Sequence, residues 1–261
     1  MKKALLGSLV GVLVVGGGVA ATVFMTQDNG GKTQSKAHES SVTKPLQDGE
    51  AQGKTHESST KKPLQDGKVS AKSSYSIPEK DLKSSSYVSS GAPSEVGEYT
   101  INQQGNKAEL AAQSKVENQL DNGSITYKVT SVKKMANTPA TDEAVQMAQM
   151  ALNTRDITGD YTTLIVRYSL TNNADKTVVT DGVTAAKFSD GSVVSVQGGG
   201  LDNDHTLVSG VEAGQTKDTF VVLLVPKSLA VSVNNVALQF ATTYQDGQQL
   251  TGASDPLDVK F

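Results

Sequence analysis

Apolar and polar residues alternate with a period of two along much of the C-terminal part of the chain, as they do in half-buried β-strands. The strongest pattern covers residues 162–171, with four apolar side chains on one face: Leu164, Val166, Tyr168 and Leu170. Residues 220–225 are instead continuously apolar and stop at Pro226. Such a run predicts a strand that is buried on both faces in the centre of a sheet.

Turn signals between these runs predict hairpins. Residues 115–132 alternate on both sides of an Asn-Gly pair at 122–123, and an Asp-Gly pair at 190–191 separates two further runs. The alternation changes phase at Val132, which predicts a β-bulge or an exit from the sheet. The other predicted strands are residues 178–188, 192–197, 236–240 and 257–261.

One segment breaks the β pattern. Thr141 can cap a helix that runs from Asp142 to about Leu152, with acidic residues at its first two positions. Its modest apolar face, made mainly of alanines, predicts packing over one open end of the fold, and a mobile lid or partner-binding helix is the alternative. With roughly seven to nine short strands around this inserted helix, the sequence predicts an all-β fold, an antiparallel β-sandwich.

Residues 4–25 contain no charged residue and directly follow Lys2 and Lys3. As a helix they would be about 33 Å long at ~1.5 Å per residue, enough to cross a hydrocarbon core of ~30 Å. The two lysines favour a cytoplasmic N-terminus, which places the rest of the chain outside the membrane. We therefore expect a single-pass protein of the cell membrane whose C-terminal domain is extracellular.

Cleavage of this segment is the alternative. Residues 19–21 have the small side chains of a signal-peptidase site, and cleavage after Ala21 would release a secreted protein. Val23, Phe24 and Met25 extend the apolar run past that site, as in an uncleaved anchor. The chain has no cysteine, which rules out a lipoprotein-type anchor and any disulfide in the exported part.

Residues 26–94 are rich in Ser and Lys and contain only isolated apolar residues, so this segment predicts a disordered stalk. The motif HESS at 38–41 and the motif KPLQDG at 44–49 both recur 18 residues later. A duplication that lengthens the stalk accounts for this repeat, and a two-copy ligand motif is the alternative. The chain thus divides into an anchor (1–25), a stalk (26–94) and a globular head (95–261).

The head carries twelve Lys or Arg and nineteen Asp or Glu, a net charge of about −7. Negative charge repels nucleic acid and anionic membrane surfaces, so we expect neither as a partner of the head. The expected partner is a cell-surface or secreted protein, or a component of the cell wall, while the membrane is contacted through residues 4–25.

Four segments of the head carry a resemblance to a known family: residues 124–135 (SITYKVTSVKKM), 159–172 (GDYTTLIVRYSLTN), 189–194 (SDGSVV) and 212–226 (EAGQTKDTFVVLLVP). In this order they resemble an immunoglobulin-like extracellular domain family of unknown function from Gram-positive surface proteins and lipoproteins, sometimes labelled telomeric-repeat-binding-factor-like. The resemblance covers residues 115–261 and implies an immunoglobulin-like sandwich outside the cell. Many relatives carry a lipid-anchoring cysteine that this chain lacks, in keeping with a retained membrane helix. The family supplies no active site to transfer.

Residues that could carry chemistry are sparse in the head. His205 is its one histidine and lies in a polar, Gly-rich loop, and no GxSxG motif supplies a nucleophilic serine. The best metal candidates are Asp202 and Asp204, which could bind Ca²⁺ together with Asp190 or Asp181. Their spacing does not fit an EF-hand loop, so such a site would be irregular, and a solvated turn is the alternative. We expect no cofactor and no catalytic residue.

These features predict a non-enzymatic binding domain that an N-terminal membrane anchor and a flexible stalk display on the bacterial cell surface. A secreted, signal-cleaved, antigen-like or inhibitory factor is one alternative. A hydrolase that acts on cell-wall material is another, although the chain has no tryptophan to form a sugar-stacking platform. Neither the ligand nor the oligomeric state follows from the sequence.

Overall fold

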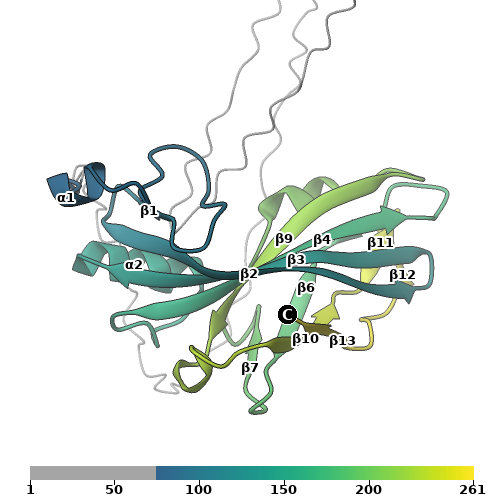
Figure 1. The fold of residues 1–261 in the computed structure, drawn as a ribbon. Helices are drawn as coiled ribbons and strands as arrows, with labels where there is room; N and C mark the ends of the chain where they lie inside the picture. The colour runs from purple at the N-terminus through teal and green to yellow at the C-terminus, as the bar shows by residue number, and fades with distance from the viewer. Residues whose placement is uncertain (1–74) are drawn as a thin grey trace, which may run out of the picture. The chain divides into compact units, whose positions relative to one another are not determined.

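The computed structural model describes residues 75–261, and the predicted anchor and most of the predicted stalk lie outside this range. The described part is all-β, as the alternation predicts, and contains thirteen strands, two α-helices and two 3-10 helices (Figure 1). It has more strands than the sequence predicts, because one predicted run, 178–188, is divided in two and four short strands of three or four residues lie outside the predicted runs. Among residues 75–261, no helix is long and apolar enough to cross a membrane.

The largest sheet is antiparallel and has the strand order β1-β2-β3-β4-β9-β8. Its strands are β1 (Tyr99–Ile101), β2 (Asn106–Asn122), β3 (Ile125–Pro139), β4 (Tyr161–Asn172), β8 (Leu201–Asn203) and β9 (Thr216–Val225). The predicted hairpin is confirmed, with its turn at Gly123 (φ 61°). The phase change near Val132 is a register shift between Val129 and Ser131, which leaves Val129 and Val132 both buried.

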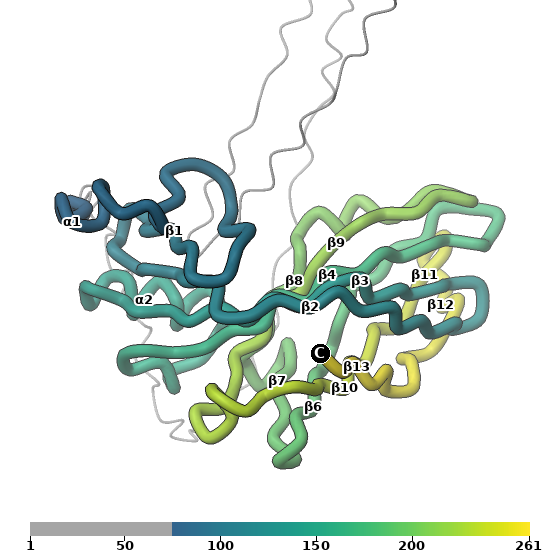
Figure 2. The backbone as a smooth tube through the Cα atoms, in the orientation of Figure 1, coloured from purple at the N-terminus to yellow at the C-terminus, as the bar shows by residue number. Residues whose placement is uncertain are grey.

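This β2–β3 hairpin is longer than the predicted 115–132 and extends across the whole described part (Figure 2). The added length carries a weaker sequence signal, because it buries small and polar side chains such as Asn106, Ala108 and Asn137 alongside only two large apolar ones. Asn106 donates to the side-chain oxygen of Asn137 (3.2 Å), and Asn137 donates to Thr163 (3.2 Å). Hydrogen bonds between these side chains make their burial tolerable without an apolar pattern.

Two smaller antiparallel sheets complete the fold. The four-stranded sheet has the order β13-β10-β6-β7, with β6 (Val183–Lys187), β7 (Val193–Ser195), β10 (Asn235–Phe240) and β13 (Leu257–Lys260). The three-stranded sheet has the order β12-β11-β5, with β5 (Val179–Thr180), β11 (Thr243–Gln245) and β12 (Gln248–Thr251). The predicted strand 178–188 is therefore two strands in two sheets. Gly182, with φ 83°, breaks the run between them.

The six-stranded and four-stranded sheets share one apolar core. All four side chains predicted from the alternation in residues 162–171 are buried in it. Phe240 of β10 stacks on Tyr127 of β3, with ring centroids 3.9 Å apart, and meets Tyr168 of β4 edge-on at 5.3 Å. β9 lies between β4 and β8, and both of its faces are packed, which confirms the interpretation of its continuous apolar run.

Helix α2 (Asp142–Ala151) follows Thr141, whose hydroxyl accepts a hydrogen bond from the Ala144 amide (3.0 Å). The sequence predicts that this helix covers an open end of the fold, and that prediction is wrong. The helix packs on the outer face of the six-stranded sheet. The reason is that β9 presents Val222 and Leu224 on that face, and Ala148 of the helix helps to bury them. The helix thus covers an apolar surface that would otherwise face water.

Residues 75–94, which the sequence assigns to the stalk, are folded onto the head. They contain helix α1 (Glu79–Leu82), and Tyr87 forms a β-bridge with Tyr99 of β1. The Tyr75 amide donates to the Gln103 carbonyl (2.8 Å). The remaining helices are the 3-10 segments η1 (His205–Ser209) and η2 (Lys227–Leu229).

Candidate functional site

Asp190, one of the three metal candidates, closes the turn between β6 and β7. Its Oδ1 accepts hydrogen bonds from the Ser192 amide (2.9 Å) and hydroxyl (2.5 Å), and its Oδ2 accepts one from the Ser228 hydroxyl (3.2 Å). The hydrogen bond from the Ser192 hydroxyl, more than any other, lowers the pKa of this carboxyl group. Its contacts are those of a turn residue.

Asp204 and Asp202 lie at the end of β8, next to η1. Asp204 caps η1: its Oδ1 accepts from the Thr206 amide (2.9 Å), and its Oδ2 accepts from the Thr219 hydroxyl (3.2 Å). Asp202 is half-buried, and burial raises its pKa. The side chain of His205 is 77% exposed, and its Nε2 lies 3.6 Å from Asp202 Oδ1, so this histidine is a surface group.

The structure brings Asp202 and Asp204 close enough that the charge of Asp204 raises the pKa of Asp202. Asp190 shares no hydrogen-bond partner with either of them, and Asp181 is exposed. Within residues 75–261, no three His, Cys, Asp or Glu side chains gather in a way that could hold a metal ion. Of the predicted calcium candidates, Asp190 is thus a turn residue, Asp204 caps η1, and Asp202 is a residue of β8 beside Asp204.

Asn203, between the two candidate aspartates, connects the two main sheets, a role that the sequence does not signal. Its side-chain oxygen accepts from the Val183 amide (3.0 Å), and its side-chain nitrogen donates to the Val183 carbonyl (2.8 Å). This contact joins β8 to β6, and Gly182 leaves the space for it, since a Cβ there would lie 2.8 Å from Asn203 Oδ1. In the polar sequence before His205, Asn203 therefore has a structural role.

Tyr127 and Tyr168 place two hydroxyl groups inside the core, where both residues are at most 1% exposed. Neither hydroxyl makes a hydrogen bond of good geometry within the described residues, and Thr180 and Thr219 are their polar neighbours. Burial raises the pKa of Tyr127 to about 12 and also raises the pKa of Tyr168. Both phenols therefore stay neutral near pH 7 and are unsuited to act as bases there.

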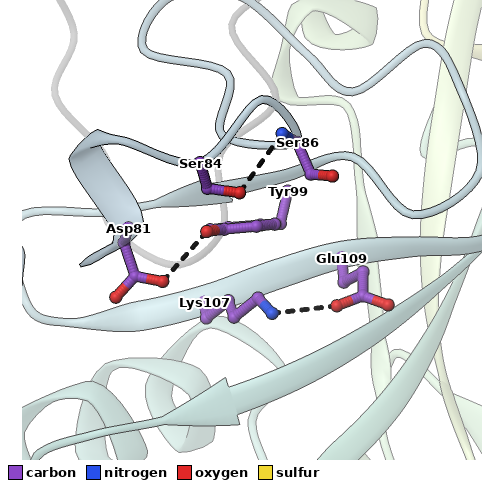
Figure 3. Close-up of polar contacts among 6 residues, drawn as sticks. All are labelled: Asp81, Ser84, Ser86, Tyr99, Lys107 and Glu109. Carbon is purple, nitrogen blue, oxygen red and sulfur yellow. Dashed lines mark hydrogen bonds and ion pairs between the residues drawn. The ribbon is translucent and has the colours of Figure 1, made fainter.

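A clamp formed by residues 75–98 holds the N-terminal part of the head around Tyr99. The Tyr99 hydroxyl donates to Asp81 Oδ1 (2.9 Å), and Lys107 Nζ lies 4.0 Å from the centre of the Tyr99 ring (Figure 3). Lys107 also forms an ion pair with Glu109 (2.9 Å), and the ring of Tyr87 lies 5.9 Å from that of Tyr99. Tyr99 thus joins α1, β1 and β2 through its ring and its hydroxyl.

Further contacts continue this clamp toward β3. Glu98 accepts hydrogen bonds from the amides of Ser94 (2.7 Å) and Glu95 (3.0 Å), and the Ser94 bond, more than any other, lowers its pKa. Lys133 of β3 donates to the Pro93 carbonyl (2.7 Å), and Gln113 of β2 donates to the Ser94 carbonyl (2.8 Å). Part of the outer face of the six-stranded sheet is therefore bordered by this segment.

The rest of that outer face lies outside the contacts of α2 and the clamp, and we call it the open face. Its side chains stand in three rows, because residues directly opposite one another in antiparallel strands share a face. The rows are Lys115, Ser131, Arg167 and Phe220; Gln119, Lys128, Ser169 and Asp218; and Asp121, Thr126, Thr171 and Thr216. Eleven of these twelve residues are polar, with Phe220 as the exception, and all twelve are at least partly exposed.

Cations dominate the part of the open face nearest the clamp. Lys115 and Arg167 share the first row, Lys128 stands diagonally next to Arg167 in the second, and Lys133 borders the face on the clamp side. Burial, and then the charge of Arg167, lower the pKa of Lys133, while the nearby Glu98 carboxylate acts in the opposite direction, so Lys133 and Arg167 repel each other. Within the described residues, none of the four forms an ion pair with a carboxylate.

Cavities in the described part do not suggest a small-molecule site. One, of about 200 Å³, lies at the ends of β3, β4 and β9 and is lined by residues that include Asp160, Tyr161 and Lys227. This is below the ~300–1,000 Å³ of typical ligand pockets. A second cavity, of about 320 Å³, is an open hollow at the C-terminal end of α2 and is lined by residues that include Gln149 and Arg155. None of the predicted site residues lines either cavity. The open face is thus the more extensive candidate surface.

No protein-family model and no curated protein matches the chain. Among solved structures, a functionally unknown protein from Listeria monocytogenes EGD-e is similar in part. It is 11% identical, the similarity covers 57% of this chain and 86% of that protein, and the TM-score is 0.38. A similarity this low carries no argument about fold family or function.

Proposed function

We propose that this chain is a non-enzymatic binding protein of a bacterial cell surface. Residues 4–25 would anchor it in the membrane, the Ser/Lys-rich segment that follows would act as a stalk, and the head would be an immunoglobulin-like domain outside the cell. The proposal combines the uncharged N-terminal segment with an all-β head that presents a polar, uncovered sheet face.

The open face is the observation that carries the binding role. The six-stranded sheet uses its inner face for the core, and α2 and the clamp cover part of its outer face. The remaining outer surface is formed by β2, β3, β4 and β9 and is rich in hydrogen-bonding groups, with Arg167 in the row nearest the clamp. A rigid sheet surface of this kind suits recognition of a partner, because its side chains are held in fixed positions before binding.

The clamp around Tyr99 supports the display role. Because residues 75–98 are fastened to the head, the stalk would meet the domain at a fixed point near Tyr75 rather than at residue 95. A fixed attachment point would limit how the head can turn relative to the last residues of the stalk. The open face could then remain accessible while the protein is tethered.

The experiment that tests this function is fractionation of the host cells, followed by mass measurement of the native protein. We expect the full-length chain in the membrane fraction. We also expect protease added to intact cells to release a fragment that begins near Tyr75, because residues 75–98 are protected by the clamp. A fragment that begins near Glu95 would show that the clamp does not hold.

Two variants make this test specific. Leu13→Arg places a charge in the middle of the apolar segment and should deplete the protein from the membrane, whereas Ala21→Leu removes the small residue at the alternative cleavage site and should change nothing. A mature protein that begins at Thr22 in the medium would overturn the anchor and favour the secreted form. In that case, Ala21→Leu should shift the protein into the membrane fraction.

A further inference from the structure

The cations of the open face stand out because the head does not lack anions. It has nineteen Asp or Glu against twelve Lys or Arg, so pairing could have neutralised these side chains. Instead, Lys115, Lys128 and Arg167 have no carboxylate partner within the described residues, and Lys133 donates to a backbone carbonyl. Like charges that neighbour one another across strands destabilise a sheet. Their concentration here therefore points to an anion that binds them.

The spread of these cations indicates the shape of that anion. Lys115 and Arg167 lie in one row two strands apart, which separates their backbones by about 10 Å at ~4.8 Å per strand. Lys128 and Lys133 flank this row on opposite sides along β3. No single small anion can contact all four side chains, whereas an extended chain with several negative groups can cross the face from one cation to the next.

The surroundings of the cations favour a phosphate-bearing polymer over an acidic peptide. Bound peptides are commonly recognised by pockets for their side chains or by addition of a strand to a sheet edge. The open face is the broad side of the sheet. Its two aspartates, Asp218 and Asp121, lie in the second and third rows, and its neutral polar members are hydroxyl and amide side chains such as Ser131, Ser169 and Gln119. Such groups can donate to phosphate oxygens, and Arg167 offers a planar fork that fits phosphate.

We propose that the open face binds a linear, phosphate-bearing polymer, with Lys115, Lys128 and Arg167 as the main contacts and Lys133 at its border. This polymer would be the partner of the proposed binding protein. The proposal rests on the proposed function only for the location, outside the cell, where the protein would meet the polymer. The negative net charge of the head still disfavours a densely charged duplex, while local attraction on the face suits a flexible, more sparsely charged chain.

The test uses the full-length protein, purified in a neutral detergent, with long-chain inorganic polyphosphate as the probe. Poly-glutamate and neutral dextran are the comparison polymers. The triple variant Lys115→Gln, Lys128→Gln and Arg167→Gln removes the cations of the open face. The control triple variant Lys187→Gln, Lys227→Gln and Lys260→Gln changes the net charge equally, at exposed positions on other parts of the head.

We expect the wild-type protein to bind polyphosphate with an affinity that falls as salt rises, because each phosphate contact releases counterions. The open-face triple variant should bind at least about 10-fold more weakly, and its slope of log affinity against log salt should be smaller by about 2, from ~0.7 per contact. The control variant should stay within about 2-fold of wild type, since surface charges outside an interface contribute little.

Three results would overturn the proposal: no binding of polyphosphate, an equal loss in the control variant, or equal or tighter binding of poly-glutamate. The last result would identify the open face as a site for acidic peptides. Far-UV circular dichroism of both triple variants checks that they fold like the wild-type protein. Cell fractionation is independent of this assay, so the anchor can fail while polymer binding holds, and the reverse.

Discussion

Gly199 is the glycine of the described residues at which replacement by alanine should lower the free energy of unfolding most. It is buried and has φ 86°, and an ideal Cβ built on it would lie 2.2 Å from the Asn153 carbonyl oxygen, just after α2. The next residue, Gly200, donates to the Leu152 carbonyl (2.6 Å), and its own carbonyl accepts from the Leu224 amide (2.7 Å). These glycines therefore fasten the end of α2 to β9 by direct backbone contact.

The cost of Gly199→Ala has three parts. The left-handed backbone costs about 1–2 kcal/mol for a residue with a Cβ. A contact of 2.2 Å with a backbone atom cannot be relieved by a rotamer change, so the helix end must move, at a cost of about 1–3 kcal/mol for overpacking. This movement weakens the hydrogen bond between Gly200 and Leu152, worth about 1 kcal/mol. We expect a total loss of about 3–6 kcal/mol in the free energy of unfolding.

Gly191→Ala is the matched control, because Gly191 has the same φ of 86° but no atom within 4 Å of an added Cβ. It should lose only the backbone contribution, about 1–2 kcal/mol. Urea unfolding followed by far-UV circular dichroism measures both values. Equal losses in the two variants would refute the reasoning, since the backbone contact would then contribute nothing. If either variant has a changed m-value, its unfolding transition differs from that of the wild-type protein, and the two free energies of unfolding are then not comparable.

Three further predictions follow from polar groups of the head. Asn203→Ala should lower the free energy of unfolding by about 2–3 kcal/mol in urea titration, because it orphans a backbone amide and carbonyl at the junction of the sheets, and a loss below about 0.5 kcal/mol would contradict that role. Tyr99→Phe should cost about 1 kcal/mol and speed amide hydrogen exchange selectively in residues 75–98, so unchanged exchange there would disprove the clamp. Burial raises the pKa values of Tyr127 and Tyr161 to about 12, above the ~10 of the unfolded chain, so the stability they contribute is complete below pH ~10 and is lost as the pH rises through 12. Ionisation of these phenols near pH 10 without unfolding, followed by absorbance at 295 nm, would contradict this pH dependence.

Strands in which each face is clearly either buried or exposed could be predicted from the sequence. Along β4, apolar residues alternate with polar ones because one face meets the core, and along β9 both faces are packed. The bulge in β3 could also be predicted, since it places Val129 and Val132 on the same side. In these cases, the hydrophobic pattern reports burial directly.

Short or polar elements could not be predicted in the same way. The β11–β12 hairpin turns at Asp246 (φ 49°) and Gly247 (φ 75°), an Asp-Gly pair that was available as a signal, but its strands carry little apolar pattern. The clamp is held by hydrogen bonds and by the ring of Tyr99, so residues 75–94 have the composition of a stalk. Composition measures the ability to form a core, and a segment that docks on an existing core does not need one.

The candidate site shows the same limit. Asp190 lies in a turn, Asp204 caps η1 and Asp202 lies in β8, and the sequence cannot show that Asp190 and Asp204 have local hydrogen-bond partners. An aspartate that caps a turn and an aspartate that binds calcium have the same neighbours in sequence. Only the three-dimensional separation of Asp190 from the other two distinguishes these roles.

The open face depends on strand register, which decides the side to which each residue of β2 and β3 points. Leu110 faces outward in contact with Met135, and the register shift at Ala111 turns the following residues over, so that Lys115 also faces outward. Without that shift, Lys115 would point toward the core, where an unpaired ammonium group is costly. The shift in β3 likewise places Lys133 beside Arg167. Two irregularities that weaken regular pairing thus gather these cations on one surface.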